Sequence, residues 1–294
     1  MGFWRWLTRG RGHGVDELAR RVGLPLADLQ QVPRVYQSFS IPKRNGGWRL
    51  IRAPNAQLRA VQRRLLRRVL VRLRSHPAAF GFERGRNIVG HAAGHSRRPV
   101  VVCLDLRDFF RSTQQGRLET YFRRVGWNRP ATRLLCALCC HEGGLPQGAP
   151  TSPRLSNLVN YGLDARLTGL AQRHGARYSR YADDLTFSFD QDDQRAIHGV
   201  IRGTKSILGE YGYRLHFGRK LRICRRHQQQ RVTGLVVNQG PRVDRRTRRR
   251  LRAALHRIRQ GRTATYQPAQ LAGWLAYLAM VRRQRPATSD SISE

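Results

Sequence analysis

Residues 178–189 (Tyr-Ser-Arg-Tyr-Ala-Asp-Asp-Leu-Thr-Phe-Ser-Phe) constrain the fold more than any other stretch of the chain. On both sides of the central Ala182-Asp183-Asp184, apolar or aromatic residues alternate with small polar ones, a period of two that is typical of β-strands. The three central residues have the small, turn-tolerant character of a tight turn. The stretch therefore predicts a β-hairpin that presents two adjacent carboxylates.

Two carboxylates this close repel each other in an apolar setting, unless protons or divalent cations neutralise them. A solvated acidic turn is the alternative reading, but the flanks are too apolar for a surface loop. A third acid, Asp105, ends a Val-rich run that begins at Val100 and predicts a strand buried on both faces. An acid at the end of such a strand is costly to desolvate without a partner. Asp105, Asp183 and Asp184 together predict a two-metal phosphoryl-transfer site for Mg²⁺.

With these motifs in this order, the chain resembles a reverse transcriptase. Asp105 is at the position of the first palm carboxylate, and residues 181–184 match the second palm motif of that family. The resemblance implies an α+β fold, a right-hand polymerase with fingers, a mixed-sheet palm and a helical thumb. The expected divisions are an N-terminal helical extension (1–33), fingers (34–98), a first part of the palm (99–112), a fingers/palm connection (113–152), a second part of the palm (153–234) and the thumb (235–294).

The charge of the chain predicts a polyanionic partner. Lys and Arg number 56 against 18 Asp and Glu, which gives a net charge of +38, and Arg supplies almost all of the excess. A ribosomal or chromatin protein would fit this charge equally well, so it indicates the class of partner and not the chemistry. A hydrophobic content of 40% indicates a globular chain.

The cysteines and the apolar runs predict where in the cell the protein is found. Five cysteines, an odd number, and no recognisable secretory segment point to a reducing, cytoplasmic location. Cys136 and Cys139 have a spacing that zinc sites use, but no second pair accompanies them, so buried thiols are the favoured interpretation. The longest apolar run, 271–281, is about half of the roughly 20 residues that span a bilayer, and it predicts a core helix and no membrane partner.

The resemblance implies that two segments contact the incoming nucleotide, a dNTP. Residues 36–54 indicate two strands joined by an Asn-Gly-Gly turn, and the resemblance implies that Lys43 and Arg49 contact the triphosphate; a solvated hairpin that touches only template is the alternative. The Gly-rich loop that opens into a helix at 143–158 resembles the family loop in which Gln147 and Gly148 border the nucleotide pocket.

Two further residues take their expected roles from the resemblance. Phe110 occupies the position of the bulky side chain that lies under the sugar and excludes a 2′-hydroxyl, while an aromatic that simply fills the core fits Phe109 better. Lys220 stands where the family has a lysine near the pyrophosphate leaving group, as a general acid or a charge clamp.

Two markers narrow the resemblance to retron reverse transcriptases. Residues 91–95 (His-Ala-Ala-Gly-His) resemble the Asn-Ala-x-x-His signature of that subgroup, with His91 in place of Asn and His95 matching; a metal-binding His pair is the alternative. Val232, Thr233 and Gly234 form the intact Val-Thr-Gly triplet. These five positions, with Arg249 on a basic helix that follows Asp244, are the predicted RNA-binding residues.

The retron resemblance implies a complete reaction. Template and primer would be one structured non-coding RNA, and synthesis would start at an internal guanosine 2′-hydroxyl and give branched RNA–DNA (msDNA), in antiphage defence. Two Mg²⁺ ions, with Mn²⁺ as a substitute, would serve catalysis, while an RNA–DNA hybrid product, a separate effector protein and a host RNase H would be partners. A group II intron-like reverse transcriptase and a catalytically silent RNA-binding scaffold remain as alternatives.

Overall fold

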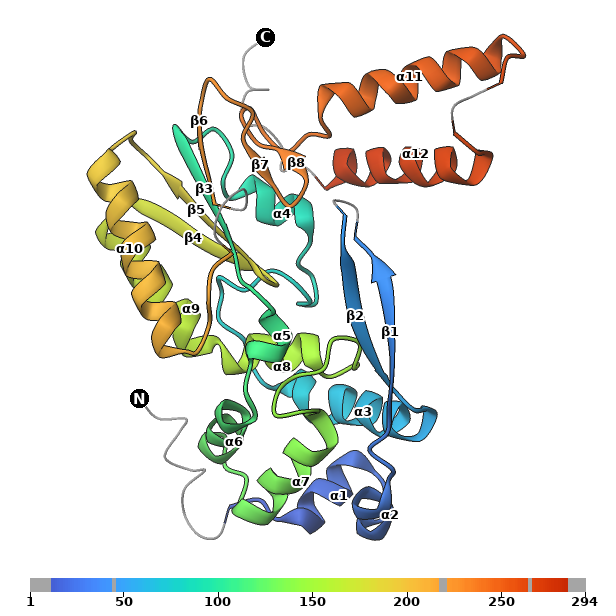
Figure 1. The fold of residues 1–294 in the computed structure, drawn as a ribbon, viewed down its shortest axis with the longest axis vertical. Coiled ribbons are helices and arrows are strands. Elements are labelled where there is room, and N and C mark those ends of the chain that lie inside the picture. Colours follow the sequence, from blue (N-terminus) through green and yellow to red (C-terminus); the bar gives the residue numbers. More distant parts are fainter. Residues whose placement is uncertain (1–11, 44–45, 217–220, 264–265, 285–294) are drawn as a thin grey trace.

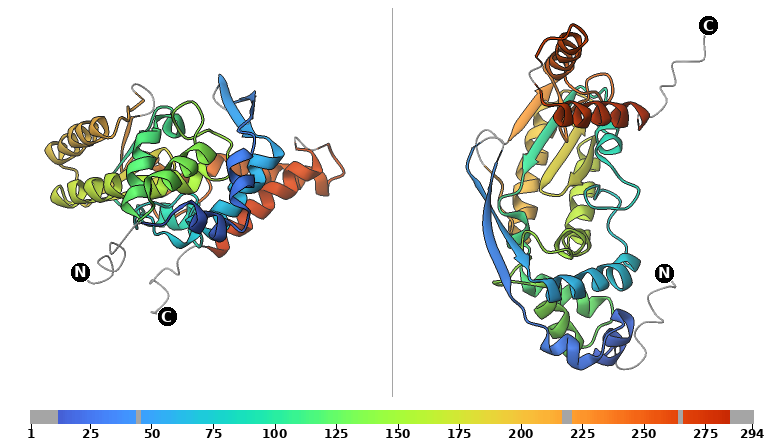
Figure 2. Two further views of the ribbon diagram at one scale, coloured as in Figure 1. Left: turned by 90° about the horizontal axis from the view of Figure 1, so that it is seen from below. Right: turned by 90° about the vertical axis from the view of Figure 1, so that its right-hand side faces the viewer.

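The computed structural model describes residues 12–43, 46–216, 221–263 and 266–284 (Figure 1). A four-stranded sheet forms the middle of an elongated molecule, a cluster of helices forms one end, and a pair of long helices forms the other (Figures 1 and 2). The N-terminal cluster begins with α1 (Val15–Val22), which ends at Gly23 with φ of 72°. Only glycine adopts this left-handed conformation readily, so Gly23 ends the helix as its position in the sequence predicts.

The central sheet has the strand order β4 (Ala176–Tyr181), β5 (Asp184–Phe189), β3 (Val100–Asp105) and β6 (Arg222–Arg225). All three pairings between these strands are antiparallel. The parallel component expected of a mixed sheet is limited here to an isolated bridge between Ala79 and Arg180 at the outer edge of β4. There the segment 78–80 exchanges two backbone hydrogen bonds with Arg180, at 2.7 and 2.8 Å.

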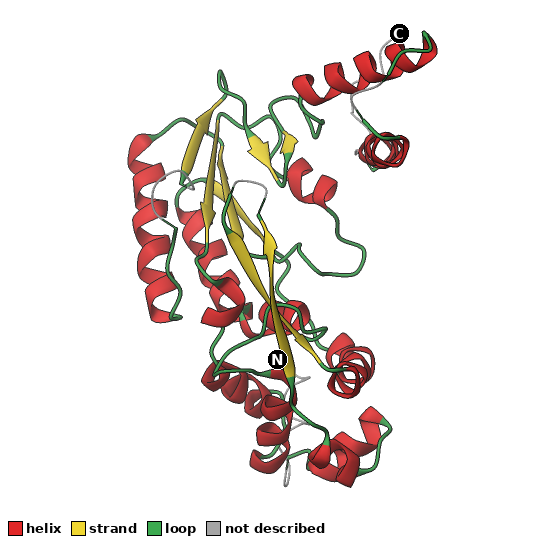
Figure 3. Cartoon of the chain, turned by 45° about the vertical axis from the view of Figure 1, so that its right-hand side comes forward, coloured by secondary structure: helices red, strands yellow, loops and turns green. Residues whose placement is uncertain are grey.

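Both faces of β3 are covered, as its Val-rich sequence predicts. Val100, Val102 and Leu104 are buried against α9 (Tyr161–Arg173) and α10 (Gln194–Glu210), which lie side by side on one face (Figures 1 and 3). Val101 faces the other way, into a cluster that includes residues of α4 (Ile88–Ala93), β7 (Arg231–Val232) and β8 (Leu235–Val236). β3 is therefore covered on both faces.

The helical cluster has its own core, in which leucines predominate. It is built from α1, α2 (Leu26–Gln31), α3 (Ala56–Arg68), α6 (Gln115–Arg124), α7 (Arg129–Cys139) and α8 (Ser152–Val159), while the short α5 (Phe109–Ser112) and the 3₁₀ turn Leu70–Arg72 join elements beside it. Cys136 and Cys139 are buried on α7, as expected of core thiols, and burial raises the pKa of Cys139 to about 12.

Two hairpins extend from this body. The antiparallel strands β1 (Tyr36–Pro42) and β2 (Trp48–Pro54) confirm the hairpin predicted at 36–54 and run from the helical cluster toward the opposite end of the molecule (Figure 1). At that end α11 (Arg245–Arg259) and α12 (Pro268–Arg283) pack against each other. Asp244 caps α11 through a bond from the Thr247 amide at 2.9 Å, as predicted. Within the described ranges, no helix combines the length and apolar character required to cross a membrane.

Candidate active site

The three predicted carboxylates lie at one end of the central sheet. Asp105, the last residue of β3, is the register partner of Asp184, the first residue of β5. Tyr181 pairs with Asp184 across the β4–β5 hairpin, so Ala182 and Asp183 form its two-residue turn. The Leu106 amide donates to the Asp183 carbonyl at 3.0 Å, which ties the turn to the end of β3. Residues far apart in the sequence thus bring three acidic side chains to adjacent backbone positions.

His216 is a neighbour of this site that the sequence did not single out. Its amide donates to the Asp105 carbonyl at 2.9 Å, and its Nε2 lies 3.5 Å from Oδ1 of the same residue. The Asp105 side chain is only 18% exposed, whereas the side chain of Asp108 is 68% exposed. Asp105 is therefore the more enclosed of the two acids at this end of β3.

The arrangement of the carboxylates fits a divalent cation bound together with a substrate. Like charges at directly opposed positions of an antiparallel pair destabilise each other, and a cation between Asp105 and Asp184 would remove that repulsion. In the described ranges, no group of three or more His, Cys, Asp or Glu side chains is arranged so that it could hold a metal ion by itself. Mg²⁺ characteristically uses one or two carboxylates, with waters and substrate phosphates as its other ligands.

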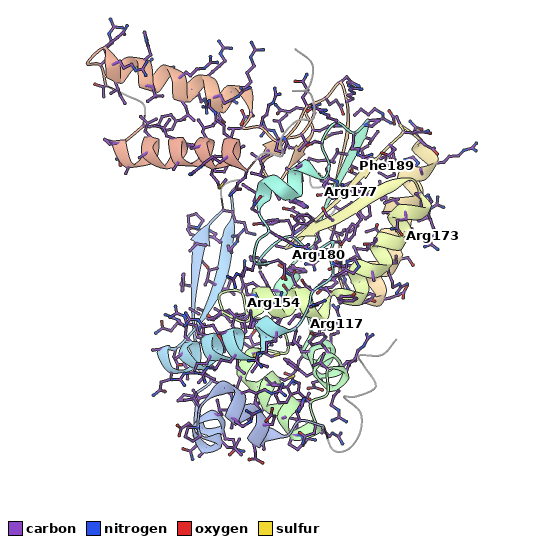
Figure 4. The ribbon with its side chains drawn as sticks, turned by 180° about the vertical axis from the view of Figure 1, so that it is seen from behind. Arg117, Arg154, Arg173, Arg177, Arg180 and Phe189 are labelled. Atoms are coloured by element: carbon purple, nitrogen blue, oxygen red, sulfur yellow. The ribbon has the colours of Figure 1, made fainter. Side chains whose placement is uncertain are left out.

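A buried arginine supports the turn from behind. Arg180 is fully buried and donates from Nε and Nη2 to the two carboxylate oxygens of Asp164, at 2.8 and 2.6 Å. Its Nη1 donates to the Ala182 carbonyl and to Oδ1 of Asn157, each at 3.1 Å (Figure 4 shows Arg180 between the sheet and the helices). Ala182 has a φ of 57°, which non-glycine residues rarely adopt. Arg180 thus holds a strained turn in place.

The support continues into the helix that follows the Gly-rich loop. Asn157 on α8 donates from Nδ2 to the Gly81 carbonyl at 2.7 Å and to Glu83 at 2.8 Å, and Glu83 pairs with Arg154. A Cβ on Gly81 would come within 2.7 Å of the Ala182 nitrogen. This close approach explains why glycine is required behind the turn.

The nucleotide-loop residues Gln147 and Gly148 dock on β2. The Gln147 carbonyl accepts a hydrogen bond from the Arg52 amide at 2.8 Å. Gly148 has a φ of 130°, and a Cβ there would come within 2.9 Å of the Arg52 carbonyl oxygen. Lys43 and Arg49 are exposed on the outer part of the same hairpin. The structure therefore joins the loop to the basic hairpin through Arg52, which the sequence analysis did not select.

The aromatic residues around Phe110 differ in how deeply they are buried. Phe109 is buried and stacks on Tyr213 with ring centroids 5.8 Å apart, so it fills the core as expected. Phe110 is only partly buried and lies 6.2 Å from Phe82, measured between ring centroids. Phe82 is 48% exposed, has a φ of 64° and lies 6.5 Å from Tyr181. No pattern in the sequence pointed to Phe82, because its position depends on the pairing of the preceding residues, 78–80, with Arg180 on β4.

The two His markers are inside the protein. His91 and His95 both have 0% exposure, and burial lowers the pKa of His91 to about 4. His95 hydrogen-bonds Ser179 on β4 at 2.6 Å and Ser188 on β5 at 2.8 Å, so it bridges both strands of the carboxylate hairpin. In this arrangement neither ring is accessible to RNA, because each is surrounded by protein. The predicted direct contact is therefore not available to them.

The two subgroup markers meet in space. His91 Nδ1 lies 3.5 Å from the Thr233 hydroxyl, which donates to the Ile88 carbonyl at 3.1 Å. Val232 is buried, Thr233 is partly exposed and Gly234 is exposed. Arg249 lies exposed on α11. Lys220, the expected general acid or charge clamp, lies outside the described residues.

Comparison with known proteins agrees with this geometry. The reverse transcriptase (RNA-dependent DNA polymerase) family profile matches residues 41–237. The chain is 39% identical to the retron Mx65 reverse transcriptase of Myxococcus xanthus over 86% of this chain and 62% of that protein. It is 35% identical to the retron Mx162 reverse transcriptase of the same species, over 92% of this chain and 66% of that protein.

A third relative is covered more fully. The chain is 32% identical to the retron Ec86 reverse transcriptase of Escherichia coli over 89% of this chain and 87% of that protein. The chain thus spans somewhat less than two thirds of the two Myxococcus relatives and most of the Escherichia coli one. The chain belongs to the reverse transcriptase family and, within it, to the retron reverse transcriptases.

Proposed function

We propose that the protein is the RNA-directed DNA polymerase of a retron, which copies part of a structured non-coding RNA into DNA. The observation that carries the proposal is the meeting of Asp105, Asp183 and Asp184 at one end of a buried sheet. Family membership supports the proposal, because the relatives of this chain are named as retron reverse transcriptases.

The proposed division of labour follows the right-hand polymerase arrangement. The central sheet with α9 and α10 acts as the palm, the β1–β2 hairpin and the helical cluster as fingers, and α11 with α12 as the thumb. Lys43 and Arg49 contact the triphosphate of a dNTP, Gln147 and Gly148 border its pocket, and Phe110 excludes a 2′-hydroxyl.

Two Mg²⁺ ions, with Mn²⁺ as a substitute, would be held by the three aspartates. When bound, they supply activation of the primer hydroxyl and neutralisation of the triphosphate. The aspartates contribute the negative charge that holds them, and His216 lies within reach of the Asp105 carboxylate. Lys220 is proposed to act near the leaving pyrophosphate.

The wider setting is proposed from retron membership. One RNA serves as template and primer, synthesis starts from an internal guanosine 2′-hydroxyl, and the product is a branched RNA–DNA hybrid (msDNA) made in the cytoplasm. A host RNase H and a separate effector protein would act with it in antiphage defence. Thr233, Gly234 and Arg249 remain candidates for contact with the RNA.

One experiment tests the core of this proposal. The protein is expressed in its natural host, the RNA that copurifies with it is sequenced, and a transcript of that RNA is supplied with dNTPs and Mg²⁺. We expect DNA joined to the RNA through a 2′–5′ linkage, which a debranching enzyme releases. DNA synthesis only from an added annealed primer would contradict self-priming, and no synthesis from either substrate would contradict the polymerase assignment.

A further inference from the structure

A cavity of about 710 Å³ lies where the Val-Thr-Gly turn meets α11 and α12. It falls within the range of about 300–1,000 Å³ that is usual for ligand sites in proteins. Its lining includes Arg231, Thr233, Asp244, Gly273, Trp274 and Tyr277. Figure 1 shows α11 and α12, which contribute to this lining, at the end of the molecule away from α5, the short helix that follows β3.

Two aromatic rings form part of its wall. Trp274 and Tyr277 are edge to face, with centroids 5.9 Å apart and planes inclined at 81°. Both rings are partly exposed: Trp274 packs against the small core between α11 and α12, and Tyr277 packs against the cluster that contains Val232. Each ring thus packs against a core cluster and also lines the cavity. Exposed aromatic faces of this kind serve as stacking platforms for unpaired bases.

A glycine keeps the cavity open. Gly273 lies in the interior of α12, where glycine is less favourable than alanine because it has more conformational freedom to lose. A Cβ on Gly273 would meet no atom within 4 Å, so packing within the protein does not require glycine there. Because Gly273 lines the cavity, a side chain at this position would occupy the space beside Trp274.

A second cavity adjoins the first and is strongly basic. It has a volume of about 640 Å³ and is lined by Gln229 and by Arg245, Arg246, Arg249 and Arg250 of α11. Arg231 and Asp244 line both cavities, so the two are neighbours at these residues. The arginines suit phosphates, whereas the Asp244 carboxylate repels phosphate from the boundary and can accept a hydrogen bond from a base N–H.

We propose that the aromatic cavity binds one unpaired nucleotide of an RNA, with the base against Trp274 and Tyr277 and the flanking phosphates on the arginines of α11. This proposal rests on the RNA-binding function proposed above. A base inside a duplex is stacked and paired, so only a nucleotide from a tail, bulge or loop can enter. The pocket would let the protein distinguish a stem with an adjacent unpaired nucleotide from a plain stem.

The test compares two labelled RNA stems, one blunt and one with an unpaired tail of about five nucleotides of random sequence. We expect the tail to increase the affinity of the wild-type protein roughly 5- to 150-fold, the range given by stacking of one base. Gly273→Leu should remove this increment and leave binding of the blunt stem unchanged. Ala276→Leu is the matched control on the same helix, because Ala276 is exposed and does not line the cavity.

Two further measurements keep the result interpretable. Thermal unfolding should show that Gly273→Leu does not lower Tm, since leucine favours a helix more than glycine does. A tail that carries 4-thiouridine should photo-crosslink to the peptide with Trp274 and Tyr277. Equal binding of tailed and blunt stems by the wild type, or an increment that survives Gly273→Leu, would overturn the proposal.

Primer extension separates this proposal from the function it rests on. If the wild type extends a DNA primer annealed to RNA but binds the tailed stem no more tightly than the blunt stem, only the proposal of a nucleotide pocket is wrong. If the wild type neither binds the stems nor extends the primer, the proposed function fails as well.

Discussion

Arg180 and Asp164 form a completely buried ion pair, and the same guanidinium donates to the carbonyl of Ala182 in the turn that carries Asp183. The pair joins β4 to α9, and Asn157 extends it to α8. The guanidinium donates four hydrogen bonds in fixed directions, three to side-chain oxygens and one to the Ala182 carbonyl, which the single ammonium group of lysine cannot reproduce. The position of the turn that carries Asp183 therefore depends on a charged group that is fully buried.

Arg180→Lys should lower the rate of primer extension at least tenfold and reduce the free energy of unfolding by about 3 kcal/mol, since it breaks charged hydrogen bonds in the interior. Urea unfolding and primer extension at saturating dNTP measure the two effects. Arg166→Lys is the control, because Arg166 lies on α9, the helix that carries Asp164, and forms an exposed ion pair with Glu210 of α10. Wild-type activity in Arg180→Lys would show that the turn does not need this support.

Replacing the carboxylates should separate chemistry from binding. Asp183→Asn or Asp184→Asn should abolish DNA synthesis by removing charge that neutralises Mg²⁺, while RNA binding persists because the basic surfaces supply the affinity. Gel-shift and extension assays on the same protein preparations measure both. Asp108→Asn is the matched control, since Asp108 is an exposed acid three residues beyond Asp105. Synthesis near the wild-type rate in Asp184→Asn would refute the site.

Phe110→Ala should admit ribonucleotides, because a smaller side chain leaves room for a 2′-hydroxyl. The measurement is the ratio of kcat/KM for dNTP to that for the matching ribonucleotide. Phe82→Ala provides the comparison, since Phe82 is exposed and lies beside Phe110. If discrimination against ribonucleotides falls in Phe82→Ala and persists in Phe110→Ala, then Phe82, not Phe110, is the side chain that excludes the 2′-hydroxyl.

Buried His91 should make the protein less stable in acid. Burial lowers the pKa of His91 from 6.5 to about 4, so the unfolded chain binds more protons than the folded one between these pH values. The stabilisation is complete above pH 6.5 and decreases as the pH falls toward 4, by about 2 kcal/mol at pH 5. Urea unfolding at pH 7.5 and pH 5 measures it.

His91→Asn gives the matched comparison, because it removes the titrating ring and restores the family pattern at residue 91. The loss of stability between the two pH values should become smaller in this variant. A variant that loses as much stability as the wild type would assign the acid sensitivity to other groups, of which His95 is the nearest.

Arg249→Gln should weaken RNA binding in a salt-dependent manner. Loss of one phosphate contact should reduce the slope of log K against log salt concentration by about 1, with similar effects on different RNA sequences. Fluorescence anisotropy over a series of salt concentrations measures the slope. Arg195→Gln on α10, on the other side of the molecule in Figure 1, is the control. Equal slopes for Arg249→Gln and the wild type would place the phosphate contacts elsewhere.

The sequence alone determined the features that depend on local pattern. Alternation over 178–189 predicted the strands β4 and β5, the Val-rich run predicted a strand covered on both faces, and Asp244 predicted the start of α11. These succeed because strand period, burial pattern and helix capping are set by residues within a few positions of one another. The excess of arginine also predicted a polyanionic partner, because net charge depends on composition alone and not on the fold.

Only the tertiary structure decided which side chains are buried and which meet. His91 and His95 have the polarity of surface residues, yet both are fully buried: His91 lies on α4, and His95, just after α4, bonds to Ser179 and Ser188 of the carboxylate hairpin. Three contacts join residues from separate parts of the chain: the ion pair of Arg180 with Asp164, the approach of His216 to Asp105, and the ring contact of Phe110 with Phe82. The burial and partners of a polar side chain are set by whatever packs against it, and that information is spread over residues that the chain brings together only when it folds.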